Sequence, residues 1–184
     1  GSKAQYIFQW CKNNKYECTL FDYSGHGKSS EDFINTSIKE WIEDALEILT
    51  TVPSNPQILI ASSMGGWIAL KISLISLAKI KGLVTIAAAP DFTKRLWQKE
   101  LNIKQKNEIT KKGFTSIPSE YNSSGYIITK KLIEEGNKNL VLSNKKNIFT
   151  FPLKLIHGDK DLAVSWKEIL KIINKNNNEK SELI

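Results

Sequence analysis

A strand pattern runs directly into a helix pattern at residues 58–70, ILIASSMGGWIAL. The β-branched run at 57–62 predicts a strand, and the mostly apolar run at 65–80 predicts a helix. Four small residues lie at the corner, whereas a plain connection needs one glycine or one capping residue. Small residues on both sides of Ser63 indicate that this serine is held in a cramped, exposed position.

Strands and helices alternate along the rest of the chain. The run GLVTIAAA at 82–89 is apolar on both faces, as expected for a strand deep inside a parallel sheet. This alternation predicts an α/β fold with a mostly parallel sheet, flanking helices and right-handed crossovers. The other expected elements are a helix at 4–13, a strand at 16–23, a glycine loop at 24–30, a helix from Thr36 or Ser37 with Glu40 as its capping-box partner, a strand at 152–158, a helix at 164–174 and the start of a strand at 181–184.

Residues 91–147 differ in character from the rest of the chain. They are polar and helix-prone, with turn breaks at Gly113, Pro118, Gly125 and Gly136. A chain of 184 residues is long enough for one ordinary domain. We therefore expect a single domain over 1–184, in which 91–147 is a helical cap insertion above the sheet.

Composition narrows the possible partners and settings. The formal net charge is +7, but the lysines are scattered and no nucleic-acid-binding motif accompanies them, so we expect no nucleic-acid partner. No apolar run approaches the roughly 20 residues that cross a bilayer, and the N-terminus lacks signal-peptide architecture. Cys11 and Cys18 make no disulfide framework, and no Cys/His cluster has zinc spacing. We expect an intracellular setting and no metal or cofactor.

The corner at Ser63 has the spacing of a nucleophile elbow. A serine hydroxyl attacks well only when a base takes its proton and the group is presented in the open, as a tight strand–helix turn presents it. Ala61 and Gly65 flank the central Ser63, with alanine where glycine is usual, and small residues there avoid a collision with strand and helix. The N–H of Met64, at the start of the helix, is a candidate donor to an oxyanion. The alternative is a glycine-rich turn that happens to contain serines.

Two further segments carry patterns that follow strands. Residues 21–29, FDYSGHGKS, have the form D-x-x-G-x-G-x-S, and residues 156–164, IHGDKDLAV, have the form H-G-x-x-D-x-x-V. With the serine corner, and in this order, they resemble the α/β-hydrolase fold over essentially the whole chain. More narrowly, GSKA, FDYSG, SSMGGW and GFTSIPSEY resemble the mitochondrial abhydrolase-domain acyl-protein thioesterases, also known as acyl-glucuronide esterases, and their bacterial relatives.

The resemblance implies roles for individual residues. Ser63 would be the nucleophile and Asp161 the acid that orients a histidine, with Asp159 as the competing acid. A structural role for Asp161, as an N-cap-type residue before the next helix, stays open. The order in this superfamily is serine, acid, histidine, yet His26 and His157 both precede Asp161. We expect loop packing from His157, packing or pocket lining from His26, and the catalytic histidine beyond residue 184.

The same resemblance implies that the chain is truncated at both ends. Members of this fold carry three strands before the helix at 4–13, and the third lies in the sheet between the strands at 16–23 and 57–62. Without it, two apolar strands would have exposed edges, which favour aggregation. We therefore expect a partial domain that is inactive by itself because it lacks the catalytic histidine.

The leading functional hypothesis is a serine hydrolase of acyl esters or thioesters, acting on a small molecule or an acylated protein through an acyl-enzyme on Ser63. The resemblance implies a cytoplasmic location for a bacterial protein and a mitochondrial one for a eukaryotic protein. Alternatives are a non-catalytic remnant that acts as a binding module, and another reaction of the fold, such as peptide, lactone or epoxide hydrolysis; epoxide hydrolases, however, place Asp at the nucleophile. His26 is a candidate pocket residue, and five apolar cap residues form either an acyl pocket or only the core of the cap: Phe92, Trp97, Phe114, Ile117 and Tyr121.

Overall fold

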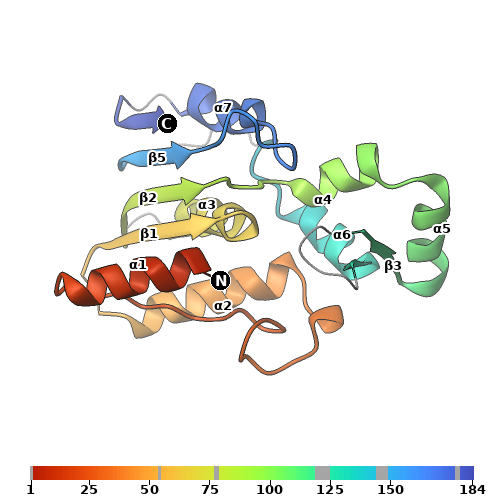
Figure 1. Cartoon of the computed structure of the whole chain (residues 1–184), viewed down its shortest axis with the longest axis horizontal. Coiled ribbons are helices and arrows are strands. Elements are labelled where there is room, and N and C mark those ends of the chain that lie inside the picture. The colour runs from red at the N-terminus through yellow and green to blue at the C-terminus, as the bar shows by residue number, and fades with distance from the viewer. Residues whose placement is uncertain (1, 54, 77–78, 119–124, 144–148, 177–178) are drawn as a thin grey trace.

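The computed structural model describes residues 2–53, 55–76, 79–118, 125–143, 149–176 and 179–184. Its main sheet has parallel strands in the order β1-β2-β5-β6 (Figure 1). This architecture confirms the α/β class with a mostly parallel sheet, and β2 lies inside the sheet as its apolar run predicts. The strands are β1 (Gln57–Ser62), β2 (Ile80–Ile86), β5 (Leu153–Ile156) and β6 (Ser181–Leu183).

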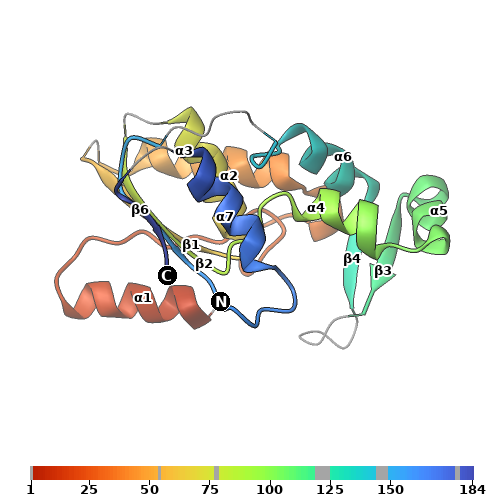
Figure 2. The same cartoon turned by 90° about the horizontal axis from the view of Figure 1, so that it is seen from above.

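Helices lie on both sides of this sheet. Figure 2 shows α2, α3 and α7 on one face and α1 on the other. The core centres on α2 and α3, which contribute the fully buried Trp41 and Trp67. No helix in the described part of the chain is both long and apolar enough to cross a bilayer. The bounds are α1 (Ser2–Asn13), α2 (Ile38–Thr51), α3 (Met64–Ile75) and α7 (Trp166–Lys175), with a short turn η1 (Phe33–Asn35) before α2.

The start of α2 follows the predicted signal. Ser37 is the N-cap, and its Oγ accepts the N–H of Lys39 at 3.3 Å. The expected partner Glu40 is present, but its carboxylate accepts the Ser37 hydroxyl at 2.6 Å. Both interactions stabilise the first turn, where the N–H groups have no partner within the helix.

The bounds of several elements differ from those expected, and three of these elements end earlier. The helix predicted at 65–80 ends at Ile75, and β2 already begins at Ile80. The strand predicted at 82–89 ends at Ile86, because Ala87 turns out of the ladder with a φ of 48°. The strand predicted at 152–158 is shorter, from Leu153 to Ile156.

The strand predicted at 16–23 is wrong. These residues run without helix or strand hydrogen bonding, and most of them are exposed. A strand exists only through the ladder that it forms with a neighbour. In the described part of the chain β1 pairs with β2 alone, and 16–23 does not pair with the free edge of β1. Aromatic alternation thus marked an extended segment, but the segment has no ladder partner.

We call the segment 91–147 the cap segment. Its described residues lie beyond the carboxyl ends of β1 and β2 (Figures 1 and 2). It contains more than the expected helices, because β3 and β4 form an antiparallel pair. That pair was not predicted, since each strand has only four residues. The elements are α4 (Phe92–Arg95), a π-helical turn η2 (Leu96–Glu100), α5 (Ile103–Lys112), β3 (Phe114–Ile117), β4 (Tyr126–Thr129) and α6 (Lys130–Lys138).

The free edge of β1 generates a test. Ile58 and Ile60 on this strand are 67% and 46% exposed, and an apolar edge of this kind favours strand pairing between molecules. We expect Ile58→Lys to raise the protein concentration at which self-association begins, as measured by light scattering. The control is Ile103→Lys, because Ile103 is 79% exposed on the helix α5 and offers no strand edge. Equal effects of the two substitutions would contradict an edge-driven association.

Candidate active site

Ser63 lies where β1 meets α3, and its backbone is strained. Its φ is 51° and its ψ is −126°, in a region that residues with a side chain rarely adopt. The residue is exposed, and it follows the last ladder pair of β1 with β2, Ser62 with Ile86. The expected tight bend at the carboxyl edge of the sheet is therefore present, with the side chain of Ser63 open to solvent.

Hydrogen bonds on both sides of Ser63 hold this strained conformation. Its N–H donates to the carbonyl of Ile86 at 3.1 Å, and its own carbonyl accepts the N–H groups of Gly66 at 2.9 Å and Ala89 at 3.0 Å. Unfavourable backbone angles persist only where the surroundings over-determine them. The loop after β2 thus fixes the bend together with the first turn of α3.

The steric requirement falls on a different glycine from the one predicted. A Cβ at Gly66 would lie 2.5 Å from the Cβ of Ala88, so no side chain fits there. A Cβ at Gly65 would lie 3.9 Å from its nearest neighbours, the Cβ of Ala61 and the hydroxyl of Tyr23, which is ordinary contact. The predicted collision at Gly65 is wrong, because crowding comes from the loop after β2 and not from β1.

Met64 opens α3 directly after the bend. The first N–H groups of a helix have no partner within it, and the helix dipole favours negative charge at this end. The backbone N–H of Met64 therefore lies at a helix end that suits an oxyanion, and its role as a donor stays a prediction.

Asp161 lies at the same edge of the sheet as Ser63, in the loop after β5. The ladder aligns Ser62 of β1 with Ile86 of β2, and Ile86 with Ile156 at the end of β5, so β2 alone lies between the two loops. The Oδ1 of Asp161 accepts the N–H groups of Ala163 at 2.9 Å and Val164 at 3.0 Å. Its loop is thereby closed by one carboxylate oxygen.

Two alternatives to a catalytic Asp161 are a structural role before α7 and the competing acid Asp159. Ser165 is the N-cap of α7, but the Oδ1 of Asp161 makes N-cap-type contacts with two N–H groups of the preceding loop, as the structural alternative predicts. The competing Asp159 is exposed, whereas the side chain of Asp161 is 23% exposed. A carboxylate fixed by backbone N–H groups is better suited to orient a base than one free in solvent.

Both histidines are engaged in packing. The side chain of His157 is 0% exposed, and its Nε2–H donates to the carbonyl of Val164 at 2.7 Å, with the Oδ2 of Asp161 3.6 Å away. The Nδ1–H of His26 donates to the carbonyl of Ser24 at 3.1 Å. The ring of His26 lies edge-on to Trp41, with centroids 5.0 Å apart. These contacts agree with the packing roles expected for both residues.

The candidate pocket residues of the cap segment do not share one environment. Trp97 and Phe92 are half-buried against the core, and Phe92 lies edge-on to Trp67 with centroids 5.5 Å apart. Phe114 is 45% exposed and lines a shallow hollow of about 420 Å³ together with Ile34 and lysines of α5 and α6. Phe92 and Trp97 thus contribute to core packing, and Tyr121 lies outside the described residues.

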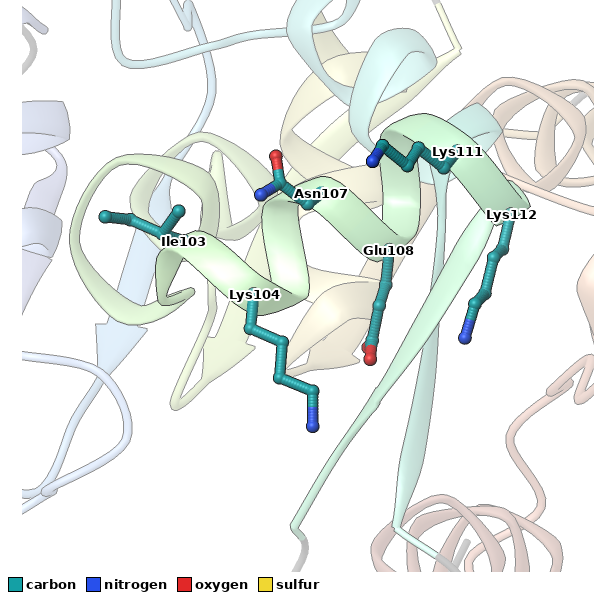
Figure 3. Close-up of a pocket in the computed structure, with 6 residues that line it drawn as sticks. All are labelled: Ile103, Lys104, Asn107, Glu108, Lys111 and Lys112. Atoms are coloured by element: carbon teal, nitrogen blue, oxygen red, sulfur yellow. The ribbon is translucent and has the colours of Figure 1, made fainter.

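A second hollow, of about 370 Å³, follows the outer face of α5 (Figure 3). Lys104, Glu108 and Lys112 project from it side by side. Neither hollow is lined by Ser63 or Asp161. Among the described residues no three His, Cys, Asp or Glu side chains gather as metal ligands.

The role of the loop that joins β2 to the cap segment was not predicted from the sequence. Ala87 donates its N–H to the carbonyl of Ile156 at 2.8 Å, and Ala89 donates to Ser63, so this loop contacts both neighbouring loops of the site. The signal was the run of small residues AAAPD after an apolar strand. Its three alanines were instead predicted to belong to the strand at 82–89.

Similarity to known proteins agrees with this geometry. The profile of the family described as serine aminopeptidase, S33 (Hydrolase_4) matches residues 1–132. The chain belongs to this α/β-hydrolase family. The palmitoyl-protein thioesterase ABHD10, mitochondrial, of Rattus norvegicus is 35% identical to this α/β-hydrolase chain over 176 residues. That match covers 95% of the chain but only 59% of the rat protein.

Two solved structures of the family are also similar at 32% sequence identity. A hydrolase of Agrobacterium vitis S4 matches with a TM-score of 0.93 over 100% of this chain and 72% of its own. The α/β-hydrolase domain-containing protein 10 from mouse matches with a TM-score of 0.87 over 100% of this chain and 73% of its own. The resemblance to abhydrolase-domain thioesterases and their bacterial relatives is thereby confirmed.

Backbone strain at Ser63 can be measured through stability. Glycine tolerates the positive φ of this residue, so Ser63→Gly should have a free energy of unfolding about 1–3 kcal/mol higher than Ser63→Ala. At Ser62, which lies in β1, the order should be reversed, because glycine weakens a strand. Urea denaturation of the four variants tests both comparisons. The same order at both positions would contradict strain at Ser63.

Tyr23, whose hydroxyl lies near Gly65, makes the stability of the protein depend on pH. Burial and the nearby charge of Asp44 raise the pKa of Tyr23 from 10.0 to about 12. The folded protein therefore keeps a proton that the unfolded chain releases, so this contribution to stability is complete below pH 10 and is lost as the pH rises toward 12. We expect Tyr23→Phe to lose stability less steeply than the wild type above pH 10, in denaturation experiments at a series of pH values. Parallel losses would contradict this.

Proposed function

We propose that this chain carries the nucleophile and the acid of a serine hydrolase that cleaves acyl esters or thioesters. The observation that carries the proposal is the strained, exposed Ser63 between a parallel strand and the N-terminus of α3. Membership of the α/β-hydrolase family supports it. Backbone strain of this kind is concentrated at functional sites, which favours chemistry at Ser63 over a plain glycine-rich turn.

The proposed reaction forms an acyl-enzyme. The Oγ of Ser63 attacks the acyl carbonyl carbon while a base takes the hydroxyl proton, and the N–H of Met64 stabilises the oxyanion. The bond from carbon to the leaving sulfur or oxygen breaks, and the leaving group takes the proton. Water then attacks the acyl-enzyme, releases the carboxylic acid and returns the proton to Ser63.

Asp161 would orient the base through Oδ2, since Oδ1 is bound by two backbone N–H groups. We infer that neither histidine of the chain is that base. The imidazole of His157 is enclosed and donates to Val164, and that of His26 packs among aromatic rings. The chain spans 59% of the rat relative's length, so the activity proposed here is that of the whole protein.

The names of the relatives support one substrate class. The rat relative is named a mitochondrial palmitoyl-protein thioesterase, and we propose a thioester or ester of a fatty acyl group, on a small molecule or on a protein, as the substrate. An intracellular location accompanies this proposal. The apolar side chains Phe92, Trp97 and Phe114 and the ring of His26 stay candidates for contact with the acyl chain.

The enclosed histidines favour one alternative, a non-catalytic module that binds but does not turn over. Adding imidazole to the solution separates the two functions, because imidazole supplies a general base that the chain itself does not. With imidazole, we expect a fluorophosphonate probe and p-nitrophenyl acyl esters to modify Ser63, located by mass spectrometry of the peptide. Without imidazole, modification should be much slower.

Matched variants decide the assignment. Ser63→Ala should abolish the modification, whereas Ser62→Ala should leave it unchanged. Asp161→Asn should slow it and Asp159→Asn should not. Modification at Ser62, or none at either serine with imidazole present, would favour the binding module.

A further inference from the structure

A single buried carboxylate joins the two ends of the cap segment. Asp91, its first residue, is 5% exposed and adopts a left-handed backbone conformation with a φ of 55°. Its Oδ1 accepts the N–H of Val141 at 2.8 Å, and its Oδ2 accepts the N–H of Leu142 at 2.9 Å. Asp91 thus connects the point at which the chain leaves β2 with the point at which it returns from α6.

A second contact joins the two ends of the cap segment, which we call its root (91–93 and 139–142), to α3, the helix that follows Ser63. Trp67, in the first turns of α3, donates its Nε1–H to the carbonyl of Asn139 at 3.1 Å. The same indole lies against Phe92, the residue after Asp91. Between α4 and α6 there is no free space, because a Cβ at Gly136 would lie 2.2 Å from the Oγ1 of Thr93. The helices α4 and α6 are therefore tightly packed against each other where the cap segment begins and ends.

The loop that carries Asp91 also holds the bend at Ser63. Ala89 donates its N–H to the Ser63 carbonyl, and only Pro90 separates Ala89 from Asp91. We propose that Asp91 is a positioning residue that fixes the cap segment relative to Ser63. The helices α4 and α6 then keep one position and do not open as a lid. The proposal rests on the proposed function, since it concerns how an acyl chain is held near Ser63.

The chemistry of the contact explains why this residue is an aspartate. Each of the two N–H groups is bound by its own oxygen of Asp91, and a carboxylate provides two such oxygens whereas an amide provides one. Burial raises the pKa of Asp91, while the two N–H groups and the charges of Lys94 and Lys71 act in the opposite direction. Asparagine has the same shape but turns an NH₂ group toward one of the N–H groups. Asp91→Asn therefore breaks the contact without leaving a cavity.

Hydrogen exchange of the backbone amides tests the proposal without any need for catalysis. In Asp91→Asn, we expect exchange in α4, α5 and α6 to become about tenfold faster or more, while β1 and β2 keep the wild-type rates. The matched control is Asp44→Asn, because Asp44 accepts the N–H and the hydroxyl of Ser24 in the body of the protein. This control should loosen 24–30 and leave the cap segment unchanged.

A kinetic comparison distinguishes positioning from a general loss of structure. With imidazole as the base, Asp91→Asn should raise the half-saturating concentration of a long-chain p-nitrophenyl ester several-fold. Acylation of Ser63 by p-nitrophenyl acetate, which has no chain to be held, should keep its rate. Should the wild-type chain accept no acyl group, the proposed function fails, and exchange alone then decides the role of Asp91.

Two outcomes would overturn the proposal. One is unchanged exchange in the cap segment of Asp91→Asn, and the other is acceleration throughout the chain, including β1 and β2. If Asp91→Asn does not fold, Trp67→Phe removes the Nε1–H bond to Asn139 and keeps the aromatic contact. Faster exchange confined to α4 and α6 in this variant supports a fixed root, and wild-type exchange overturns it.

Discussion

The strained backbone of Ser63 is the constraint on which the rest of the site depends. A positive φ at a serine is unfavourable by itself, and it persists here because three backbone hydrogen bonds hold the residue from both sides. Two of these bonds come from outside α3, from the end of β2 and from the loop that follows it. Ser63, the candidate nucleophile, is therefore positioned by its neighbouring strand as much as by its own turn.

The loop at 87–91 makes that neighbouring strand the organiser of the site. Ala87 bonds the end of β5, which leads to Asp161; Ala89 bonds Ser63; and Asp91 bonds the returning end of the cap segment. The loop adopts positive φ at both of its ends, at Ala87 and Asp91, so it turns sharply within five residues. Ser63, the loop of Asp161 and the cap segment are thus all bonded to one short piece of backbone. Such an arrangement suits the proposed chemistry, which depends on small distances.

The sequence predicted those parts of the fold that local physics determines. The corner at Ser63 was predictable because a run of β-branched residues, a group of small residues and an apolar helix each point to one structure. The strand at 16–23 was predicted wrongly because a ladder depends on a neighbour that local alternation does not report. The contacts of Asp91 with Val141 and Leu142, 50 and 51 residues away, have no local signature at all. Motif spacing therefore located Ser63 and Asp161, while the groups that hold them became visible only in three dimensions.

The free edge of β1 does not disturb the contacts of Ser63, because these contacts lie on the side of β1 that pairs with β2. β1 bonds β2 over its whole length, and Ser63, the 87–91 loop and the Asp161 loop follow β1, β2 and β5 in turn. Solvent reaches Ile58 and Ile60 on β1, whereas the bonds that hold Ser63 come from the end of β2, from the loop after it and from α3. The relative placement of Ser63 and Asp161 thus depends on three adjacent parallel strands. A strand added beyond β1 would cover apolar surface and contribute stability without being needed to bring Ser63 and Asp161 to the same edge.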